Sequence, residues 1–249
     1  MSTIEASAVD ARPASAIALE RQLGTVIVTG GASGLGAAAA DAIAGAGGTP
    51  IILDRAEVSS DARHEAAQLD LADGIAAART VESLVVRCGG VDGVVTAAGI
   101  DTPGAFLDVP LEVWQRIIAV NLLGTAAVIR AALPSLLERR GRIVTVASTL
   151  GHRAVSDATA YCASKFGVVG FTRSLTAELK GRVGVTMLTP GGMHTAFFED
   201  RDEKYKPAAD AALCRPEDVA AGVVFALSRP VGCEVKELVI APETETSWP

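Results

Sequence analysis

The chain has 249 residues, of which 49% are apolar and 20% charged, and its formal net charge at pH 7 is −7. This length suits one large domain or two small ones, and the apolar fraction excludes wholesale disorder and a disulfide-stapled miniprotein. The negative charge and the scarcity of aromatic residues (4%) argue against a nucleic-acid partner, because nucleic acid is bound through clustered Lys and Arg.

The cysteines and the N-terminus indicate the compartment. The four cysteines contain no CxxC pair, so we expect no metal site and reduced thiols in a cytoplasmic protein. No run approaches the roughly 18 consecutive apolar residues of a membrane helix, so no membrane partner is expected. Acidic residues at 5, 10 and 20 are unlike a secretory signal. We interpret residues 1–22 as a flexible extension and 23–249 as one domain.

Strands and helices are predicted to alternate along this domain. The first strand, 25–29, is β-branched throughout and leads through a glycine-rich turn into an Ala-rich helix at 37–46. Further strands are predicted at 50–53, 65–69, 93–97, 142–147, 184–188 and 237–240, and further helices at 73–87, 110–138, 159–180 and 216–228. This order predicts an α/β fold: one doubly wound Rossmann-type domain with a parallel sheet of about seven strands and helices on both faces.

The glycine-rich turn is a predicted dinucleotide site. Residues 29–36 read TGGASGLG between a strand and a helix, the context that this interpretation requires. Gly30, Gly34 and Gly36 allow a tight turn and a close approach to pyrophosphate, Ser33 adds a hydroxyl, and Leu35 starts the helix whose N-terminus attracts the anion. A plain strand–helix turn is the alternative.

Acidic residues follow the next two strands. Asp54, after the second strand, is placed to accept the ribose hydroxyls and to repel a 2′-phosphate, which favours NAD over NADP. Arg55 could instead accommodate that phosphate, and Asp54 could simply end its strand. Asp70 is placed to reach the adenine amino group, and Leu71 to pack against the ring.

Tyr161 and Lys165 are predicted to share one helix face, because their spacing is i, i+4. A nearby ammonium and the positive nicotinamide ring favour the phenolate, so we expect a lowered pKa at Tyr161 and acid–base catalysis by it. Ser148, after the strand at 142–147, can orient the substrate oxygen. Asn121, inside the helix at 110–138, is either a satisfied buried amide or part of a proton relay.

Together these motifs resemble the short-chain dehydrogenase/reductase family over residues 24 to about 242. The resemblance implies a catalytic tetrad of Asn121, Ser148, Tyr161 and Lys165. It also implies that Lys165 binds the nicotinamide ribose, that Thr195 contacts the carboxamide beside the Pro190-Gly191 turn, and that the chain forms a homotetramer or homodimer through the helices at 110–138 and 159–180.

Two features depart from the family pattern. Thr96-Ala97-Ala98-Gly99 stands where the family has Asn-Asn-Ala-Gly. Ala97, Ala98 and Gly99 should still pack against the adenosine, while the missing amides must be replaced by other groups. The segment between Asp54 and Asp70 is short, and we predict that the helix between the second and third strands is lost or reduced to a turn.

The substrate is predicted to be a hydrophobic secondary alcohol or ketone. Residues 192–213 should form a lid whose first part is apolar. The expected substrate pocket combines residues of this lid with two from the segment before Tyr161: His152, Val155, Met193, His194, Phe197 and Phe198. The alternatives are an NADPH-dependent 3-oxoacyl-[acyl-carrier-protein] reductase and a non-catalytic dinucleotide-binding protein.

Overall fold

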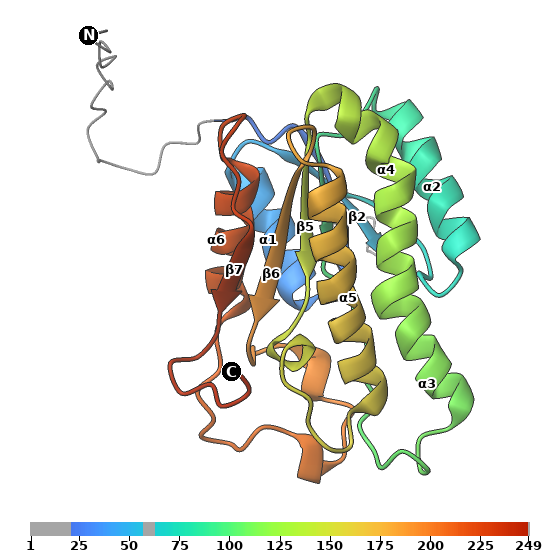
Figure 1. The fold of residues 1–249 in the computed structure, drawn as a ribbon, viewed down its shortest axis with the longest axis vertical. Coiled ribbons are helices and arrows are strands. Elements are labelled where there is room, and N and C mark those ends of the chain that lie inside the picture. The colour runs from blue at the N-terminus through green and yellow to red at the C-terminus, as the bar shows by residue number, and fades with distance from the viewer. Residues whose placement is uncertain (1–20, 57–62, 249) are drawn as a thin grey trace, which may run out of the picture.

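The computed structural model describes residues 21–56 and 63–248. Its seven strands form one sheet in the order β3-β2-β1-β4-β5-β6-β7, and every pair is parallel (Figure 1). The strands are β1 (Thr25–Thr29), β2 (Thr49–Asp54), β3 (Glu65–Gln68), β4 (Gly93–Thr96), β5 (Arg142–Val146), β6 (Gly184–Pro190) and β7 (Glu237–Ile240). This confirms the predicted doubly wound α/β fold.

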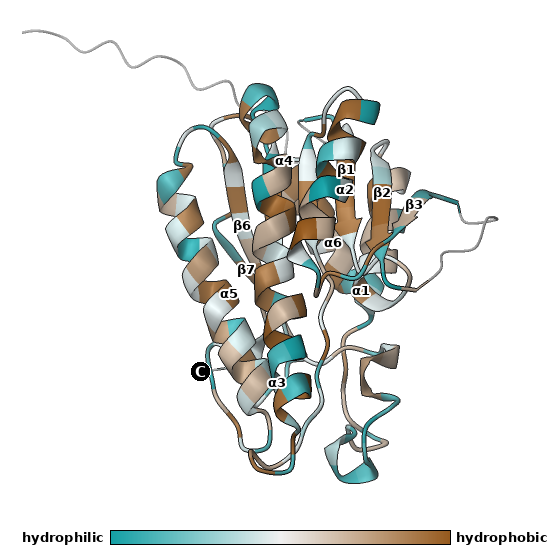
Figure 2. Cartoon of the chain, turned by 90° about the vertical axis from the view of Figure 1, so that its right-hand side faces the viewer, coloured by the Kyte–Doolittle hydropathy of each residue, from teal (hydrophilic) through white to brown (hydrophobic). Residues whose placement is uncertain are grey.

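Helices cover both faces of the sheet. On one face α1 (Gly34–Gly45) packs against α6 (Pro216–Leu227). The other face carries α2 (Gly74–Arg87), α4 (Thr125–Arg139) and α5 (Thr159–Glu178), with α3 (Leu111–Ile118) beside α5. Their hydrophobic sides meet the largely hydrophobic strands between the two layers (Figure 2).

The alternation of side chains along β1 explains why helices must cover both faces of the sheet. Ile27 contributes to the core beneath α2 and α4, whereas Val26 and Val28 contribute to the core beneath α1 and α6. A strand that is apolar on both sides can be buried only between two helical layers. The edge strand β3 is mostly exposed, and its sequence, Glu65–Gln68, is correspondingly less apolar.

The strand order predicts where along the sheet a ligand crevice forms. β1 has β2 on one side and β4 on the other, so the chain winds in opposite directions from this point. Loops leaving the carboxyl ends of these strands separate there and form a crevice, which is where ligands bind in open α/β sheets. In Figure 1 these carboxyl ends point downwards, toward the lid and the C-terminus.

The predicted helix at 110–138 is divided by a π-helical turn. The turn covers Ala119–Gly124 and lies between α3 and α4. By length and composition the whole stretch Leu111–Arg139 could cross a membrane, but here Val128, Ile129 and Leu136 are buried in the core. π-turns of this kind are frequent at functional sites, and this one contains Asn121.

Two predictions fall on residues outside the described ranges. The proposed extension at 1–22 is described only from residue 21 onward. The predicted loss of the helix between β2 and β3 rests largely on residues 57–62, which are not described. The described residues on either side, 55–56 and 63–64, are not helical.

Candidate active site

A cavity of about 990 Å³ runs along the carboxyl ends of the strands, from the glycine-rich turn to Tyr161. Every residue predicted to bind the dinucleotide lines it: Gly30, Ser33, Gly34, Leu35, Gly36, Asp54, Arg55, Asp70, Leu71, Ala97, Ala98, Gly99, Tyr161, Lys165, Pro190, Gly191 and Thr195. Among the described residues, no cluster of His, Cys, Asp and Glu is arranged to hold a metal ion.

The glycine-rich turn is shaped so that only glycine fits at two of its positions. Gly30 has a φ of +71°, and a Cβ there would lie 2.7 Å from Cα of Ala98. A Cβ on Gly36 would lie 2.0 Å from the carbonyl oxygen of Gly30. The N-cap residue Ser33 makes no capping hydrogen bond through its side chain. The hydroxyl and the N-terminal amides of α1 are therefore free to bind a pyrophosphate.

Asp54 ends β2 and also holds the glycine-rich turn. Its Oδ2 accepts a hydrogen bond from the backbone N–H of Ala32 at 3.0 Å, and its Oδ1 accepts one from that of Ala56 at 2.9 Å. Both oxygens keep a further lone pair for a ligand. Arg55 lies beside it in the cavity wall. Asp54, which favours NAD, and Arg55, which could favour NADP, therefore both line the cavity.

Asp70 is held by a partner that the sequence did not indicate. Arg116 of α3 donates from Nη2 to Oδ2 of Asp70 at 2.7 Å, and the N–H of Ala72 donates to Oδ1 at 2.9 Å. Burial raises the pKa of Asp70, but these hydrogen bonds, together with the charges of Arg116 and Arg55, outweigh burial and lower the pKa overall. The carboxylate is fixed at the wall of the cavity as an acceptor.

Ser148, Tyr161 and Lys165 meet at the other end of the cavity. Lys165 Nζ donates to the carbonyl oxygen of Val146 at 2.9 Å and lies 5.7 Å from the centroid of the Tyr161 ring. Burial lowers the pKa of Lys165 to about 8. Ser148 follows β5, and its Oγ accepts from the N–H of Leu150 at 3.1 Å. Tyr161 and Lys165 of α5 therefore line the same cavity as Ser148, which follows β5.

The pKa of Tyr161 is raised in the protein without dinucleotide, whereas the expectation of a lowered pKa included a bound nicotinamide ring. In the protein alone, burial raises it to about 12, a hydrogen bond with Ser148 opposes that rise, and Asp101 adds to it. Desolvation disfavours the phenolate, and the buried ammonium of Lys165 does not reverse this. The charge of Arg201 also lowers this pKa but does not offset burial, so we expect the positive nicotinamide ring to be needed for a lowered pKa.

Asn121 is a satisfied buried amide. Its Oδ1 accepts from the N–H of Ile100 at 2.8 Å, and its Nδ2 donates to the carbonyl of Ile100 at 2.9 Å and to Oγ of Ser164 at 3.0 Å. It is 1% exposed and is not part of the cavity wall. These hydrogen bonds satisfy the amide and fix the backbone after Gly99, whereas a part of Asn121 in a proton relay stays a prediction.

Ser164 is a positioning residue that sequence reasoning missed. Its Oγ donates to the backbone carbonyl of Tyr161 at 2.7 Å and accepts from Asn121. The hydroxyl therefore connects the π-helical turn to the first turn of α5. The sequence shows that Ser164 lies between Tyr161 and Lys165, but this spacing does not reveal its hydrogen bond with Asn121 on another helix.

The lid brings some predicted substrate residues to the cavity and leaves others out. Phe197, Phe198, Met193 and Val155 line the cavity, and the Phe197 ring lies 5.7 Å from that of Tyr161. The two histidines do not line this cavity. His194 is exposed and lines an adjoining groove of about 630 Å³, which shares Met193 and Phe198 with the cavity, and His152 packs edge-on against Trp248 at 5.2 Å. Loop position could not decide which way these imidazoles point.

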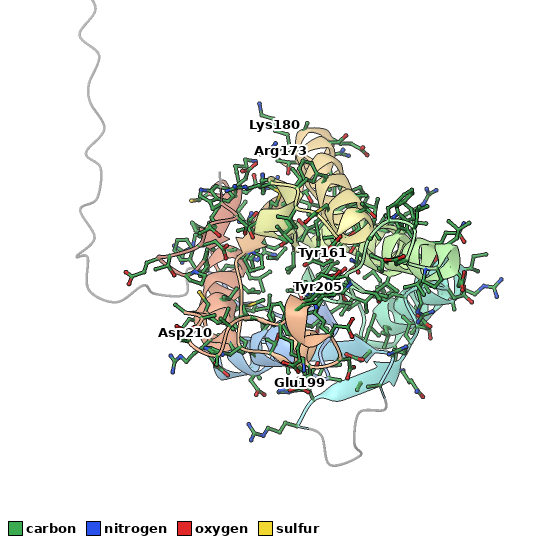
Figure 3. All side chains as sticks on the ribbon, turned by 90° about the horizontal axis from the view of Figure 1, so that it is seen from below. Tyr161, Arg173, Lys180, Glu199, Tyr205 and Asp210 are labelled. Atoms are coloured by element: carbon green, nitrogen blue, oxygen red, sulfur yellow. The ribbon has the colours of Figure 1, made fainter. Side chains whose placement is uncertain are left out.

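The lid is anchored across the open end of the sheet. The hydroxyl of Tyr205 donates to Oδ2 of Asp157 at 3.1 Å, and the carbonyl of Asp157 accepts from Gly104 at 2.7 Å. Figure 3 views the molecule from this end, with Glu199, Tyr205 and Asp210 of the lid labelled. Three segments far apart in the sequence are thereby joined over the cavity.

The C-terminal tail folds over the same cavity. Glu245 accepts a hydrogen bond from the N–H of Gly192 at 3.1 Å, and Ser247 Oγ donates to Oγ1 of Thr149 at 2.7 Å. Both Glu245 and Ser247 line the cavity. No sequence motif marked these residues, because their role depends on where the tail passes after β7.

The departure at 96–99 is accommodated by a neighbouring strand. The N–H of Ala98 donates to Oγ1 of Thr29 at 3.1 Å, so the end of β1 supports the segment after β4. Within the described residues, the buried hydroxyl of Thr96 has no hydrogen-bond partner. The backbone of the segment remains packed against the cavity, as expected from the sequence.

Comparison with known proteins gives consistent matches. The family model for short chain dehydrogenases matches residues 24–206. The chain is 40% identical over 185 residues (70% of this chain, 73% of the relative) to the 2-dehydro-3-deoxy-L-rhamnonate dehydrogenase (NAD(+)) of Sphingomonas sp.. It is 29% identical to the meso-2,3-butanediol dehydrogenase of Serratia marcescens (82% and 86% covered). The fold matches the alcohol dehydrogenase of Thermococcus sibiricus complexed with 5-hydroxy-NADP, with a TM-score of 0.76, 24% identity, and 87% and 95% of the chains covered.

Proposed function

The chain belongs to the short-chain dehydrogenase family, and on that premise we propose that this oxidoreductase interconverts a secondary alcohol and a ketone with NAD as the hydride carrier. The observation that carries the proposal is the single cavity that joins the glycine-rich turn to Ser148, Tyr161 and Lys165. A dinucleotide bound along it supplies the nicotinamide that accepts or gives the hydride.

Tyr161 is the acid–base residue in this proposal. In the oxidative direction its phenolate takes the hydroxyl proton of the alcohol, and in the reductive direction its hydroxyl protonates the ketone oxygen. Ser148 holds the substrate oxygen beside it, and the charge of Lys165 favours the phenolate. Asn121 and Ser164 act by positioning, since their hydrogen bonds fix Ile100 and the backbone of Tyr161.

NAD is proposed over NADP because of Asp54. Its carboxylate lies in the cavity wall at the end of β2 and would face a 2′-phosphate with a like charge. The Sphingomonas relative is NAD(+)-dependent by name, which supports this choice. Arg55 lines the same region and is the group that would favour NADP if it moved toward the phosphate.

We also propose that a second copy of the chain covers the exposed apolar side chains along α3, the π-turn and α5. Leu111 is 68% exposed, Leu123 is 58% exposed and Phe166 is 45% exposed. Exposed apolar side chains gathered on neighbouring elements are typical of association surfaces. A homotetramer or homodimer in the cytoplasm is the expected form.

A fluorescence titration with NADH and with NADPH tests the proposed cofactor, and turnover tests the acid–base residue. We expect NADH to bind about tenfold more tightly or better, a difference of about 1.4 kcal/mol, and Asp54→Asn to reduce this preference. Tyr161→Phe should keep NADH binding and lower turnover by about 10²–10⁴-fold. Tighter binding of NADPH would reverse the cofactor assignment, and full turnover by Tyr161→Phe would refute the proposed role of Tyr161.

A further inference from the structure

Two consecutive glycines begin the lid at the carboxyl end of β6. Gly191 and Gly192 both line the cavity. A glycine backbone has more accessible conformations than that of any other residue, so this pair keeps one geometry only if other parts of the chain hold it. The N–H of Gly191 donates to the carbonyl oxygen of Ile240 at 3.0 Å, and the N–H of Gly192 donates to Oε2 of Glu245 at 3.1 Å. Both acceptors lie at or after the end of β7.

The C-terminal tail, residues 241–248, packs so closely on Gly191 that no side chain fits there. A Cβ on Gly191 would lie 2.6 Å from Oε2 of Glu245 and 2.7 Å from Cβ of Ala241. Real Cβ atoms do not approach other atoms so closely in a packed interior. The absence of a side chain at this position therefore lets the Glu245 carboxylate reach the backbone at the start of the lid.

The carboxylate of Glu245 is the centre of a hydrogen-bond network. Its Oε1 accepts from the N–H of Ser247 at 3.0 Å and lies 2.7 Å from the Ser247 hydroxyl oxygen. Burial raises the pKa of Glu245, but the hydrogen bonds from Ser247, Gly192 and Thr246 outweigh burial and lower the pKa. The group is therefore ionised near neutral pH, and hydrogen bonds to an ionised acceptor are stronger than those to a neutral one.

The same tail is joined to the segment that carries Ser148. Ser247 Oγ lies 2.7 Å from Oγ1 of Thr149, the residue after Ser148. Arg153, a little further along this segment, donates to the carbonyl oxygen of Thr246. Because β5 and β6 are neighbours in the sheet, the tail connects the two segments that leave these strands.

The strand order places these contacts at the reacting end of the proposed dinucleotide site. Asp54 and Asp70, the proposed adenosine contacts, follow β2 and β3, which lie on one side of β1. β5 and β6 lie on the other side of β1, and Ser148 and Gly191 follow them. In the proposed function, a dinucleotide whose adenosine is at Asp54 therefore brings its nicotinamide to the segments that the tail holds.

The later part of the lid is attached without Glu245. Arg201 Nη2 donates to Oδ2 of Asp101 at 2.9 Å, and the Tyr205 hydroxyl donates to Oδ2 of Asp157 at 3.1 Å. Loss of the Glu245 carboxylate should therefore loosen the first residues of the lid and leave these contacts in place.

We propose that Glu245 is a positioning residue whose carboxylate holds Gly191 and Gly192 in the conformation that receives the nicotinamide ring. This inference rests on the proposed function. Glu245 acts through the backbone of the two glycines, and Ser247 connects it to the segment after Ser148. Without the carboxylate, the glycine pair must be ordered when the ring binds, and this entropy cost lowers the affinity for the dinucleotide.

Calorimetric titration with NADH and with ADP-ribose separates this role from a general effect on the fold. ADP-ribose contains every part of the dinucleotide except the nicotinamide, so its binding does not require an ordered glycine pair. Glu245→Ala should raise the Kd of NADH by about tenfold or more and leave the Kd of ADP-ribose unchanged.

Glu243→Ala is the matched control, because it removes the same charge from the same tail. Glu243 is exposed and does not line the cavity, so both affinities should stay at their wild-type values. Melting temperatures identify variants that fail to fold. If Glu245→Ala does so, Glu245→Gln replaces it: the amide keeps one acceptor oxygen, and the same selective loss should then be about threefold.

The outcomes separate the inference from the proposed function. Equal losses of affinity for NADH and ADP-ribose in a folded Glu245 variant, or an unchanged affinity for NADH, would overturn the inference. A selective loss of the same size in Glu243→Ala would also overturn it, because the charge of the tail rather than the hydrogen bond would then be responsible. These results leave the dehydrogenase intact, since the wild type still binds NADH. Failure of the wild type to bind NADH would refute the proposed function and the inference together.

Discussion

The pKa of Tyr161 can be measured with and without dinucleotide, and the difference shows how far the cofactor lowers it. With a pKa of about 12 in the protein alone, Tyr161 is almost entirely protonated near neutral pH and cannot accept a proton. Lowering this value to about 7 requires about five pKa units, or about 7 kcal/mol of differential stabilisation of the phenolate at about 1.4 kcal/mol per unit. Lys165 is already in place 5.7 Å from the ring, so we expect the positively charged nicotinamide of NAD⁺ to supply most of the difference.

The ionisation of Tyr161 can be measured by absorbance with little interference, because the chain contains only two tyrosines. In a Tyr205→Phe variant, the near-ultraviolet absorbance of tyrosinate reports on Tyr161 alone. Without dinucleotide we expect no ionisation below about pH 11 while circular dichroism shows a folded protein. Saturating NAD⁺ should lower the midpoint by several units, and NADH, whose ring is neutral, should lower it much less.

Two results would refute this reasoning. A midpoint at or below the ordinary value of about 10 without dinucleotide would mean that burial does not control the phenol. Equal shifts with NAD⁺ and NADH would mean that closure of the site, rather than the charge of the ring, favours the phenolate. Tyr161→Phe in the same background is the blank, since no tyrosine then remains.

The other predictions concern Lys165 and Gly36. Because burial lowers the pKa of Lys165 from its ordinary value to about 8, the unfolded chain binds the extra proton between that pH and about 10.5, and the free energy of unfolding should rise across this window by about 3 kcal/mol. Denaturant titrations of wild type and Lys165→Met should show a rise that the variant lacks; a parallel rise in both would contradict the assignment. Gly36→Ala should abolish NADH binding and destabilise the fold, since its Cβ would lie 2.0 Å from a carbonyl oxygen. Gly45→Ala is the matched control, because a Cβ there meets nothing within 4 Å and alanine favours the helix; equal loss of binding in both variants would contradict the steric explanation.

The architecture and the reactive groups could be predicted from the sequence alone. β-branched strands alternating with helices predict a parallel sheet between two helical layers, and residues at the carboxyl ends of such strands must share one edge. The glycine-rich turn, Asp54, Ser148, Tyr161 and Lys165 could therefore be placed around one crevice before the fold was known. These conclusions depend on local backbone preference and on periodicity, which are encoded over a few neighbouring residues.

The side chains that complete the site could be identified only in the folded chain. The Asp101–Arg201 pair, the bridge from Asn121 through Ser164, and the closure by Glu245 each join segments that no local pattern connects. The orientations of His152 and His194 and the raised pKa of Tyr161 likewise depend on burial and on packing neighbours. Desolvation and hydrogen-bond pairing depend on the atoms that surround a group, and these neighbours come together only when the chain folds.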